Sequence, residues 1–375
     1  MIGCVSSIRL RRARRGRHAT LVACVLGLSA CGSGPAAALA TPAAVSPSAR
    51  ATTAAAGSPG AEASTAPPSP ASTPLPSPSS HPGSGFRPTS PPWPGSVVGA
   101  SIGGCPTFPA DNAWNRDISS APVDPSSAAY VARIDSFRSF VHPDFGSDPS
   151  YGIPYVVVAG SQPRVPITFT AYGDQSDPGP YPVPLNAPVE QGNDGHVLVV
   201  DSGDCHLYEL YQAQRNGSGW DAASGAVFDL RSNALRPDTW TSADAAGLPI
   251  LPGLVRYDEV ASGVINHALR FTVDETQNGF IHPATHQAGV ANASDPPMGA
   301  RFRLRASFDL TPFHGEALVI LTALKRYGMI VADNGSSWFV SGSTDSRWND
   351  TDLDQLKSVP GSAFDAVQTG SIQRG

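Results

Sequence analysis

The chain has 375 residues, of which 41% are hydrophobic and 15% are charged, and its formal net charge is −6 at pH 7. This acidic balance lacks the basic footprint that the phosphates of nucleic acids require, so nucleic acid is excluded as a partner. After residue 31 no stretch approaches 18 uninterrupted apolar residues, which argues against a transmembrane helix there.

The N-terminus carries a short apolar segment behind a basic flank. Six arginines between residues 9 and 17 precede Ala19–Ala30, which contains no charge. A membrane-spanning helix needs about 20 apolar residues, so this run is too short for a permanent span and predicts a secretory signal peptide over residues 1–30. Its removal leaves 19 basic and 31 acidic side chains, a formal charge of −12.

Leu28-Ser29-Ala30-Cys31 directly ends this apolar run and resembles the lipobox of bacterial lipoproteins. The resemblance implies that Cys31 carries a lipid, becomes the new N-terminus and anchors the protein to the bacterial cell membrane on its extracytoplasmic side. The alternative is an ordinary cleavable signal in which the cysteine occurs by chance. A twin-arginine export signal is disfavoured because no suitable apolar pair follows Arg11-Arg12 or Arg14-Arg15.

Residues 31–100 have the composition of a tether. From Thr41 to Gly95 the chain is almost entirely Pro, Ser, Ala, Thr and Gly, with 14 prolines. Such a segment buries too little apolar surface to offset its ordering entropy, so it is expected to be disordered or polyproline-like. Extended at about 3.1 Å per residue, it would reach roughly 200 Å. Residues 101–375 hold nearly all the aromatic and acidic side chains and predict a single globular domain.

Short strand patterns dominate residues 101–375. Segments rich in β-branched and aromatic residues predict strands at Tyr155–Val158, Val165–Thr170, His196–Val200, Cys205–Gln212, Val264–Val273, Arg301–Ser307, Met329–Ala332 and Trp338–Ser341. Turn residues predict one hairpin around Asp201–Asp204 and a second around Asn334-Gly335. We therefore expect a mainly β fold, similar to a β-sandwich or jelly roll, with α+β as the alternative.

Helices are expected at only a few peripheral positions. Asp124 can cap a helix that has Pro125 at its first position, with Tyr130, Val131, Ile134 and Phe137 on one face. A second helix is predicted over Glu316–Tyr327 and ends at Gly328, and a third, short one starts near Asp350.

Two cysteines remain once the signal peptide and the lipidated Cys31 are set aside. Thiols exported to an oxidising compartment most often pair, so Cys105 and Cys205 are predicted to form a disulfide, with two free buried thiols as the alternative. Closing a loop of this length stabilises a fold by about 4–5 kcal/mol in the chain-entropy model.

Three local motifs have simpler explanations than catalysis or metal binding. Gly99–Gly103 matches Gly-x-Ser-x-Gly but lacks the strand and helix that a nucleophile elbow requires. His282 and His286 are spaced as in a helical metal site but are interpreted as loop histidines. The acidic residues from Asp350 to Asp354 lack the glycine of a calcium loop. We therefore predict neither a metal nor another cofactor.

The strand at Cys205–Gln212 places a carboxylate among apolar neighbours. Cys205, Leu207, Glu209 and Tyr211 share one face. A carboxylate in such a setting must be paired, or its pKa rises and it becomes suited to act as a general acid. Glu209 is therefore the first catalytic candidate, with a structural ion pair as the alternative.

The segment Val264–Val273 alternates strictly between two faces. The face with His267 is apolar, so His267 is interpreted as a core residue that could otherwise serve as a base. The opposite face is small and polar, with Asn266, Ala268, Arg270 and Thr272, and could bind a sugar. Arg270 would either clamp a carboxylate or pair with a neighbouring acid.

Arginines and aromatic residues supply the binding candidates. Arg301, Arg303 and Arg305 line one face of their strand, which predicts either a solvated edge that blocks aggregation or a surface for an acidic polymer. Several large aromatic residues could stack on sugar rings or fill the core: Tyr208, Trp220, Trp240, Tyr257 and Trp338.

Longer stretches of the domain, from Asn112 to Phe364, resemble an uncharacterised secreted bacterial domain family. They include "SNALRPDTWTSADAAGLPILPGLVRYDEV", "HALRFTV" and "ALKRYGMIVADNG". No activity is assigned to that family, so the resemblance implies a secreted domain and supplies no catalytic residue.

These patterns together predict a lipid-anchored extracytoplasmic protein that binds or cleaves glycans, with a non-catalytic binding or scaffolding lipoprotein as the alternative. Hydrolysis would use Glu209 as the acid with Asp229 or Asp258 as its partner. A lyase would instead use His196, His267 or a tyrosine as base, with Arg270 and Asn266 neutralising a uronate. An enzyme would differ from a non-catalytic lipoprotein in bringing together, in one cleft, either Glu209 and a second acid or Arg270 and a histidine.

Overall fold

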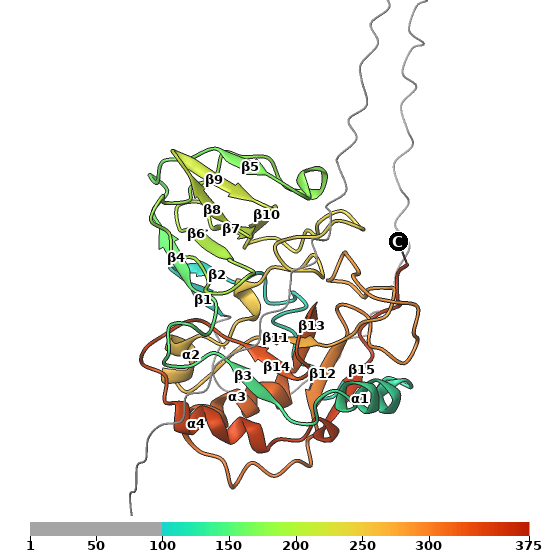
Figure 1. The fold of residues 1–375 in the computed structure, drawn as a ribbon. Helices are drawn as coiled ribbons and strands as arrows, with labels where there is room; N and C mark the ends of the chain where they lie inside the picture. Colours follow the sequence, from blue (N-terminus) through green and yellow to red (C-terminus); the bar gives the residue numbers. More distant parts are fainter. Residues whose placement is uncertain (1–99, 375) are drawn as a thin grey trace, which may run out of the picture. The chain divides into compact units, whose positions relative to one another are not determined.

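The computed structural model describes residues 100–374 (Figure 1). The predicted signal peptide, the lipobox at Cys31 and the tether lie outside these residues, and so remain predictions. The described part is mainly β with a few short helices, as the sequence predicts. None of its helices is long and apolar enough to cross a membrane.

The strands are short and fall into four sheets. In chain order they are β1 (Ser101–Ile102), β2 (Cys105–Pro106), β3 (His142–Asp144), β4 (Tyr155–Val158), β5 (Ile167–Phe169), β6 (Val197–Asp201), β7 (His206–Tyr211), β8 (Gln214–Asn216), β9 (Gly219–Ala222), β10 (Ser224–Asp229), β11 (Leu269–Val273), β12 (Arg301–Leu304), β13 (Met329–Asn334), β14 (Phe339–Ser341) and β15 (Phe364–Val367). The two larger sheets have the orders β10-β7-β6-β4 and β15-β12-β13-β11-β14-β3, and the smaller ones are β5-β9-β8 and β1-β2.

The four-stranded sheet separates two apolar cores. Leu198 and Val200 of β6 pack into the main core with the six-stranded sheet. Val197 and Val199, which point the opposite way, pack into a smaller core with Trp220 of β9. The hairpin predicted at Asp201–Asp204 is confirmed, because β6 and β7 are antiparallel neighbours.

The six-stranded sheet is built around β11, whose apolar positions Leu269, Phe271 and Val273 are fully buried. The second predicted hairpin is wrong, because β11 lies between β13 and β14 and pairs with both. The connecting loop crosses the end of β11, where the Gly335 amide donates to the Val273 carbonyl at 2.8 Å. Asn334-Gly335 therefore begins a crossover rather than a tight turn.

The helices lie beside the six-stranded sheet in Figure 1. They are α1 (Ser127–Asp135), α2 (Tyr257–Ala261), α3 (Gly315–Arg326) and α4 (Asp350–Asp354). Three were predicted, and α2, with five residues, was not. α1 buries Tyr130, Val131 and Ile134 as expected, but Phe137 follows the helix and is exposed. The predicted cap is wrong, because α1 begins at Ser127 with Ser126 as its N-cap, and the Asp124 side chain accepts a hydrogen bond from the Ser126 amide before the helix.

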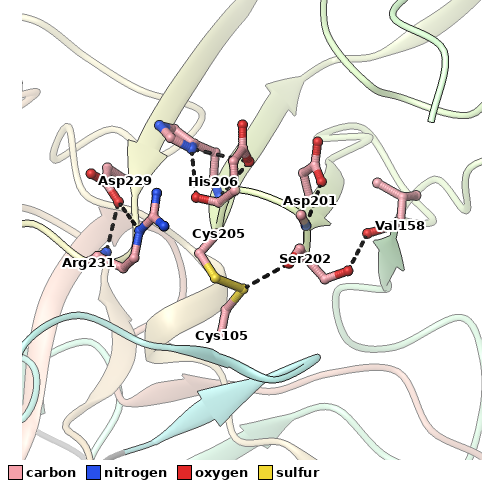
Figure 2. The surroundings of a disulfide bond; sticks show 10 residues. Cys105, Val158, Asp201, Ser202, Cys205, His206, Asp229 and Arg231 are labelled. Carbon is pink, nitrogen blue, oxygen red and sulfur yellow. Dashed lines mark hydrogen bonds and ion pairs between the residues drawn. A yellow bond between two sulfur atoms is a disulfide. The ribbon is translucent and has the colours of Figure 1, made fainter. Parts of the chain in front are cut away.

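Cys105 and Cys205 form the predicted disulfide, across 100 residues of sequence. Figure 2 shows the bond close to the turn between β6 and β7, near Ser202 and His206. The Ser202 hydroxyl donates to the carbonyl oxygen of Val158 at 2.9 Å and so ties the same turn to β4. The disulfide links the start of the domain to the four-stranded sheet.

Candidate functional site

A polar cleft of about 470 Å³ opens where strand ends of the six-stranded sheet meet the loop before β6. We call it the acidic cleft, because its charged lining consists of four acids and two cations: Asp144, Glu190, Asp194, His196, Arg270 and Asp333. β3, β11 and β13 supply Asp144, Arg270 and Asp333, respectively. The other three residues belong to the loop at 190–196.

A β-bulge places Asp333 in this cleft. Phe271 pairs with Val331, but Thr272 pairs with Asp333, so Ala332 is the extra residue of β13. Without the bulge, Asp333 would lie opposite the buried Val273 and share its face. The shift puts Asp333 opposite Thr272, on the polar face of β11, as bulges near functional sites often re-aim a side chain.

Arg270 forms the floor of the cleft and is 4% exposed. Its guanidinium donates to both carboxylate oxygens of Asp244, from Nε at 2.9 Å and from Nη2 at 3.1 Å. A third hydrogen bond goes to the Ser341 hydroxyl. Burial by itself would lower the pKa of Arg270, but attraction to Asp244 outweighs it and raises the pKa. Arg270 therefore stays charged, and Asp244 already occupies its fork.

Asp333 is the acid with the most perturbed titration in the cleft. Burial, followed by repulsion from Asp244, raises the pKa of Asp333 to about 7. Its Oδ2 lies 3.6 Å from Nη2 of Arg270, which offsets only part of this effect. A carboxyl group with this pKa holds its proton for a substantial fraction of the time at neutral pH.

Glu190 and His196 form a largely buried pair in the lining of the cleft. Nδ1 of His196 faces Oε2 of Glu190, and Nε2 lies 3.0 Å from the Ala243 carbonyl oxygen. Burial disfavours both charges, yet the mutual hydrogen bond and attraction raise the pKa of His196 and lower that of Glu190. Both ring nitrogens face acceptors, and this arrangement favours the doubly protonated form of His196 and the ionised form of Glu190.

Asp144, Asp194 and Tyr151 also line the cleft. Burial raises the pKa of Asp144, which His142 and Arg270 partly oppose. Within residues 100–374, neither Asp144 nor Asp194 makes an ion pair with a cation. Tyr151 is 56% exposed at the rim, which leaves its ring face open to a ligand.

Of the predicted catalytic residues, the structure brings His196 and Arg270 together in the acidic cleft. Glu209 lies elsewhere: it is fully buried between the two larger sheets and accepts hydrogen bonds from the Ile250 and Leu251 amides. Burial raises the pKa of Glu209 to about 7, as the sequence argument expected, but its carboxylate holds a turn and does not line the cleft.

The remaining catalytic candidates also lie outside the acidic cleft. Asp229 accepts from the Arg231 amide, and Asp258 is a largely exposed partner of Arg347. His267 is a core residue: Nε2 lies 3.0 Å from Glu259, and Nδ1 lies 2.7 Å from the Ala268 carbonyl oxygen. Asn266 is half-buried just before β11.

The expectation of a solvated arginine row is wrong for two of its three members. Arg301 and Arg303 are buried, and β12 is an internal strand rather than an edge. Their guanidinium groups donate hydrogen bonds to backbone carbonyls. Nη1 of Arg301 donates to the Ala113 carbonyl, and Nη1 of Arg303 donates to three carbonyls between residues 118 and 121. Arg305 is exposed and pairs with Asp365 at 2.8 Å. Arg301 and Arg303 therefore fix the segment at 113–121 against the sheet.

The predicted aromatic contacts also lie apart from the cleft. Trp220 and Tyr208 are buried in the smaller core, where the Tyr208 hydroxyl accepts a hydrogen bond from Arg164. Trp240 is half-buried next to Arg236, whose guanidinium lies 5.7 Å from the ring centre. Tyr257 packs on Trp348, and Trp338 is fully buried. The exposed aromatic at the cleft, Tyr151, was not among the candidates.

Five acids of the cleft region were not among the sequence-predicted candidates: Asp144, Glu190, Asp194, Asp244 and Asp333. For Asp333 the sequence holds one usable signal. It directly follows the apolar run Met329–Ala332, and a carboxylate at the end of a buried strand needs a polar or charged partner. The other acids lie in loops or at the end of a strand, where the local sequence pattern does not predict which way a side chain points.

His282 and His286 lie in loops, as the sequence predicts. His282 pairs with Asp238 at 2.8 Å, and Nδ1 of His286 lies 2.8 Å from the Ala245 carbonyl oxygen. Over the described residues, no group of three or more His, Cys, Asp or Glu side chains has an arrangement that could hold a metal ion. Comparison of the chain with protein-family models, with curated proteins and with solved structures finds no match.

Proposed function

We propose that this protein is a lipid-anchored, extracytoplasmic glycoside hydrolase that cleaves a glycan in the acidic cleft. Asp333 would donate the proton to the leaving oxygen, and Glu190 would be the ionised carboxylate that activates water or attacks the sugar. The observation that carries the proposal is that these two carboxyl groups line one cleft while their surroundings push their pKa values apart.

Glycoside hydrolysis needs this division of labour between two carboxyl groups. Asp333, with a pKa of about 7, keeps a transferable proton at the pH where most enzymes work. Glu190 stays ionised because it faces the His196 imidazolium, and the contacts of the pair use its Oε2. His196 is thus a positioning residue in this proposal, and Arg270 fixes the wall that carries Asp333.

The lining of the cleft supports a glycan as the substrate class. Sugars present hydroxyl groups to polar partners and apolar ring faces to aromatic side chains. The acidic cleft offers Asn193, Asn334 and Ser336 for the first and the exposed Tyr151 for the second. The predicted signal peptide and lipobox would place this cleft outside the cell, where envelope and environmental glycans occur.

Two contacts favour hydrolysis over elimination. A lyase acting on a uronate needs a cation that is free to neutralise the substrate carboxylate, but the fork of Arg270 is occupied by Asp244. It also needs a neutral base, and both nitrogens of His196 already face acceptors.

The test is to incubate the purified full-length protein with neutral, amino and acidic polysaccharides and to measure new reducing ends and unsaturated products. We expect reducing ends without unsaturation, and a loss of about 100-fold or more in rate for Asp333→Asn and for Glu190→Gln. Asp229→Asn, which removes one exposed carboxylate outside the cleft, is the matched control and should retain wild-type activity.

The pH profile adds an independent readout. Activity should fall above about pH 7, where Asp333 loses its proton. Unsaturated products would replace the proposal with a lyase. Binding of a polymer without turnover would leave a non-catalytic glycan-binding lipoprotein, and full activity in both cleft variants would exclude this cleft as the active site.

A further inference from the structure

The acidic cleft shares its walls with two further hollows. One, of about 580 Å³, is lined by Glu190, Gly192 and Asn193, which also line the cleft. The other, of about 240 Å³, shares Asp194, Asp333 and Asn334 with the cleft. The loop at 189–195 is therefore common to all three, and we call the combined surface the groove. A surface of this extent suits several units of a polymer rather than a single sugar.

Aromatic side chains occur along the groove outside the cleft as well. Tyr172 lines the smaller hollow and is 46% exposed, and Tyr211 lines it from β7. Tyr151 lies in the cleft itself. Exposed rings at separate positions along a groove provide stacking surfaces for successive sugar units.

The charge of the groove is strongly unbalanced. Its acids are Asp144, Glu190, Asp194, Asp221, Asp244 and Asp333, whereas Arg270 and two histidines, His196 and His286, are the basic residues that line it. Arg270 is held by Asp244, and His196 by Glu190. Asp144 and Asp194 make no ion pair among the described residues, and Asp221 accepts only an amide, from Asn216.

An anionic chain entering this groove would bring carboxylates next to carboxylates, and of the basic side chains that line the groove only His286 makes no ion pair among the described residues. An uncharged chain would leave Asp144 and Asp194 partly desolvated without compensation. A chain that carries ammonium groups would pair with them and would also be attracted from a distance by the acidic surface.

We propose that the groove takes a cationic glycan, a chain of amino sugars whose nitrogen atoms are at least partly free of acyl groups. This inference rests on the proposed function, since it names the substrate class of the same cleft. Asp144 and Asp194 recognise the ammonium groups, and Asp333 and Glu190 act on the bond between sugar units.

The experiment measures binding in the full-length Asp333→Asn protein, which should not turn over its ligand. Three hexamers are compared by calorimetry in weakly acidic buffer: glucosamine, N-acetylglucosamine and galacturonate. We expect the glucosamine hexamer to bind about 10-fold more tightly than the acetylated one at about 0.05 M salt, and this preference to shrink at about 0.5 M salt. The galacturonate hexamer should bind most weakly.

A second substitution, added to the Asp333→Asn protein, shows which carboxylates cause the preference for the glucosamine hexamer. Asp144→Asn and Asp194→Asn should each reduce the preference for glucosamine by about 3-fold, as expected for partly exposed ion pairs. Asp229→Asn changes the net charge equally but lies outside the groove, so it should leave the preference unchanged.

Equal affinity for the two amino-sugar hexamers, or tighter binding of galacturonate, would overturn the charge inference. If the acetylated hexamer is still bound, and is cleaved by the wild-type protein, the proposed function survives that result. If none of the three hexamers is bound or cleaved, both the inference and the proposed function fail for this class of glycan.

Discussion

Replacement of Asp333 by Asn tests the electrostatics of the acidic cleft through the stability of the fold, without any assumption about activity. Burial and repulsion from Asp244 raise the pKa of Asp333 from 3.8 to about 7, so the folded state holds this proton more tightly than the unfolded chain. Such a group contributes stability that is fully present below its unfolded pKa and is lost as the pH rises through its folded pKa. The wild-type protein should therefore lose stability between about pH 4 and about pH 7, and Asp333→Asn should lack this loss.

The size of the effect follows from the two pKa values. A rise from 3.8 to about 7 corresponds to about 4 kcal/mol of the free energy of unfolding. The side chain of Asp333 is 28% exposed, so water screens part of the interaction and about 2–4 kcal/mol is expected. The raised pKa of Glu209 adds a slope over the same pH range, but it does so in both proteins and cancels in the comparison.

Urea unfolding, followed by tryptophan fluorescence at steps from pH 4 to pH 8, gives the required comparison. The free energy of unfolding of Asp333→Asn should rise relative to the wild type by about 2–4 kcal/mol across the series. Asp229→Asn is the matched control, because hydrogen bonds from Arg231 lower the pKa of Asp229, and it should show no such gain. Parallel curves for Asp333→Asn and the wild type would refute the assignment of a raised pKa to Asp333.

Two further substitutions test the scaffold behind the cleft. The double variant Cys105→Ser and Cys205→Ser should lose about 4–5 kcal/mol of stability, because it frees a loop of 100 residues, and unchanged urea midpoints would contradict this. Glu209→Gln should cost about 1–3 kcal/mol: one oxygen, in the place of Oε1, can still accept from the Ile250 and Leu251 amides, but the new NH2 group replaces Oε2 and faces the Ile250 N–H. Thermal unfolding measures this cost, and an unchanged transition would mean that the turn does not depend on the carboxylate.

Local alternation predicted much of the fold, because it is a property of short segments. The pattern at Val264–Val273 identified the buried face, and Ile265, His267 and Phe271 all lie in the interior. The hairpin at Asp201–Asp204 also followed from local turn chemistry and is confirmed. The opposite face was not predicted as well, because Ala268 and Arg270 are buried too, and β11 begins only at Leu269.

The order of strands was not predictable in the same way. Asn334-Gly335 has the composition of a tight turn, yet β11 comes between β13 and β14. This insertion depends on β11, which lies about 60 residues earlier in the chain and pairs with β13 along one edge and with β14 along the other. The prediction for Arg301 and Arg303 is wrong for a related reason: apart from the Tyr327 carbonyl, the carbonyls that accept from these guanidinium groups lie more than 180 residues earlier in the chain.

The acidic cleft combines residues that are distant in sequence. Asp144, Glu190 and Asp333 come from three separate segments, and the bulge at Ala332 decides the face on which Asp333 lies. Arg270 and His196 were candidates because each carries chemistry in an informative strand pattern. Their partners Asp244 and Glu190 lie in irregular segments, where sequence alone offers no geometry.

Burial of charge alone does not identify a candidate site in this protein, as a comparison of two buried ionic clusters shows. Arg256, Glu259 and His267 form a buried ionic cluster around α2, and they line none of the hollows of the groove. The pairs Arg270–Asp244 and His196–Glu190 are as well matched, but they lie in the walls of a cleft. Buried ion pairs seldom stabilise a fold more than apolar residues of similar size would. Stability therefore accounts poorly for either cluster, and the difference between them is position: the pairs beside Asp333 lie in the lining of a cleft, which is why the proposed function is assigned there.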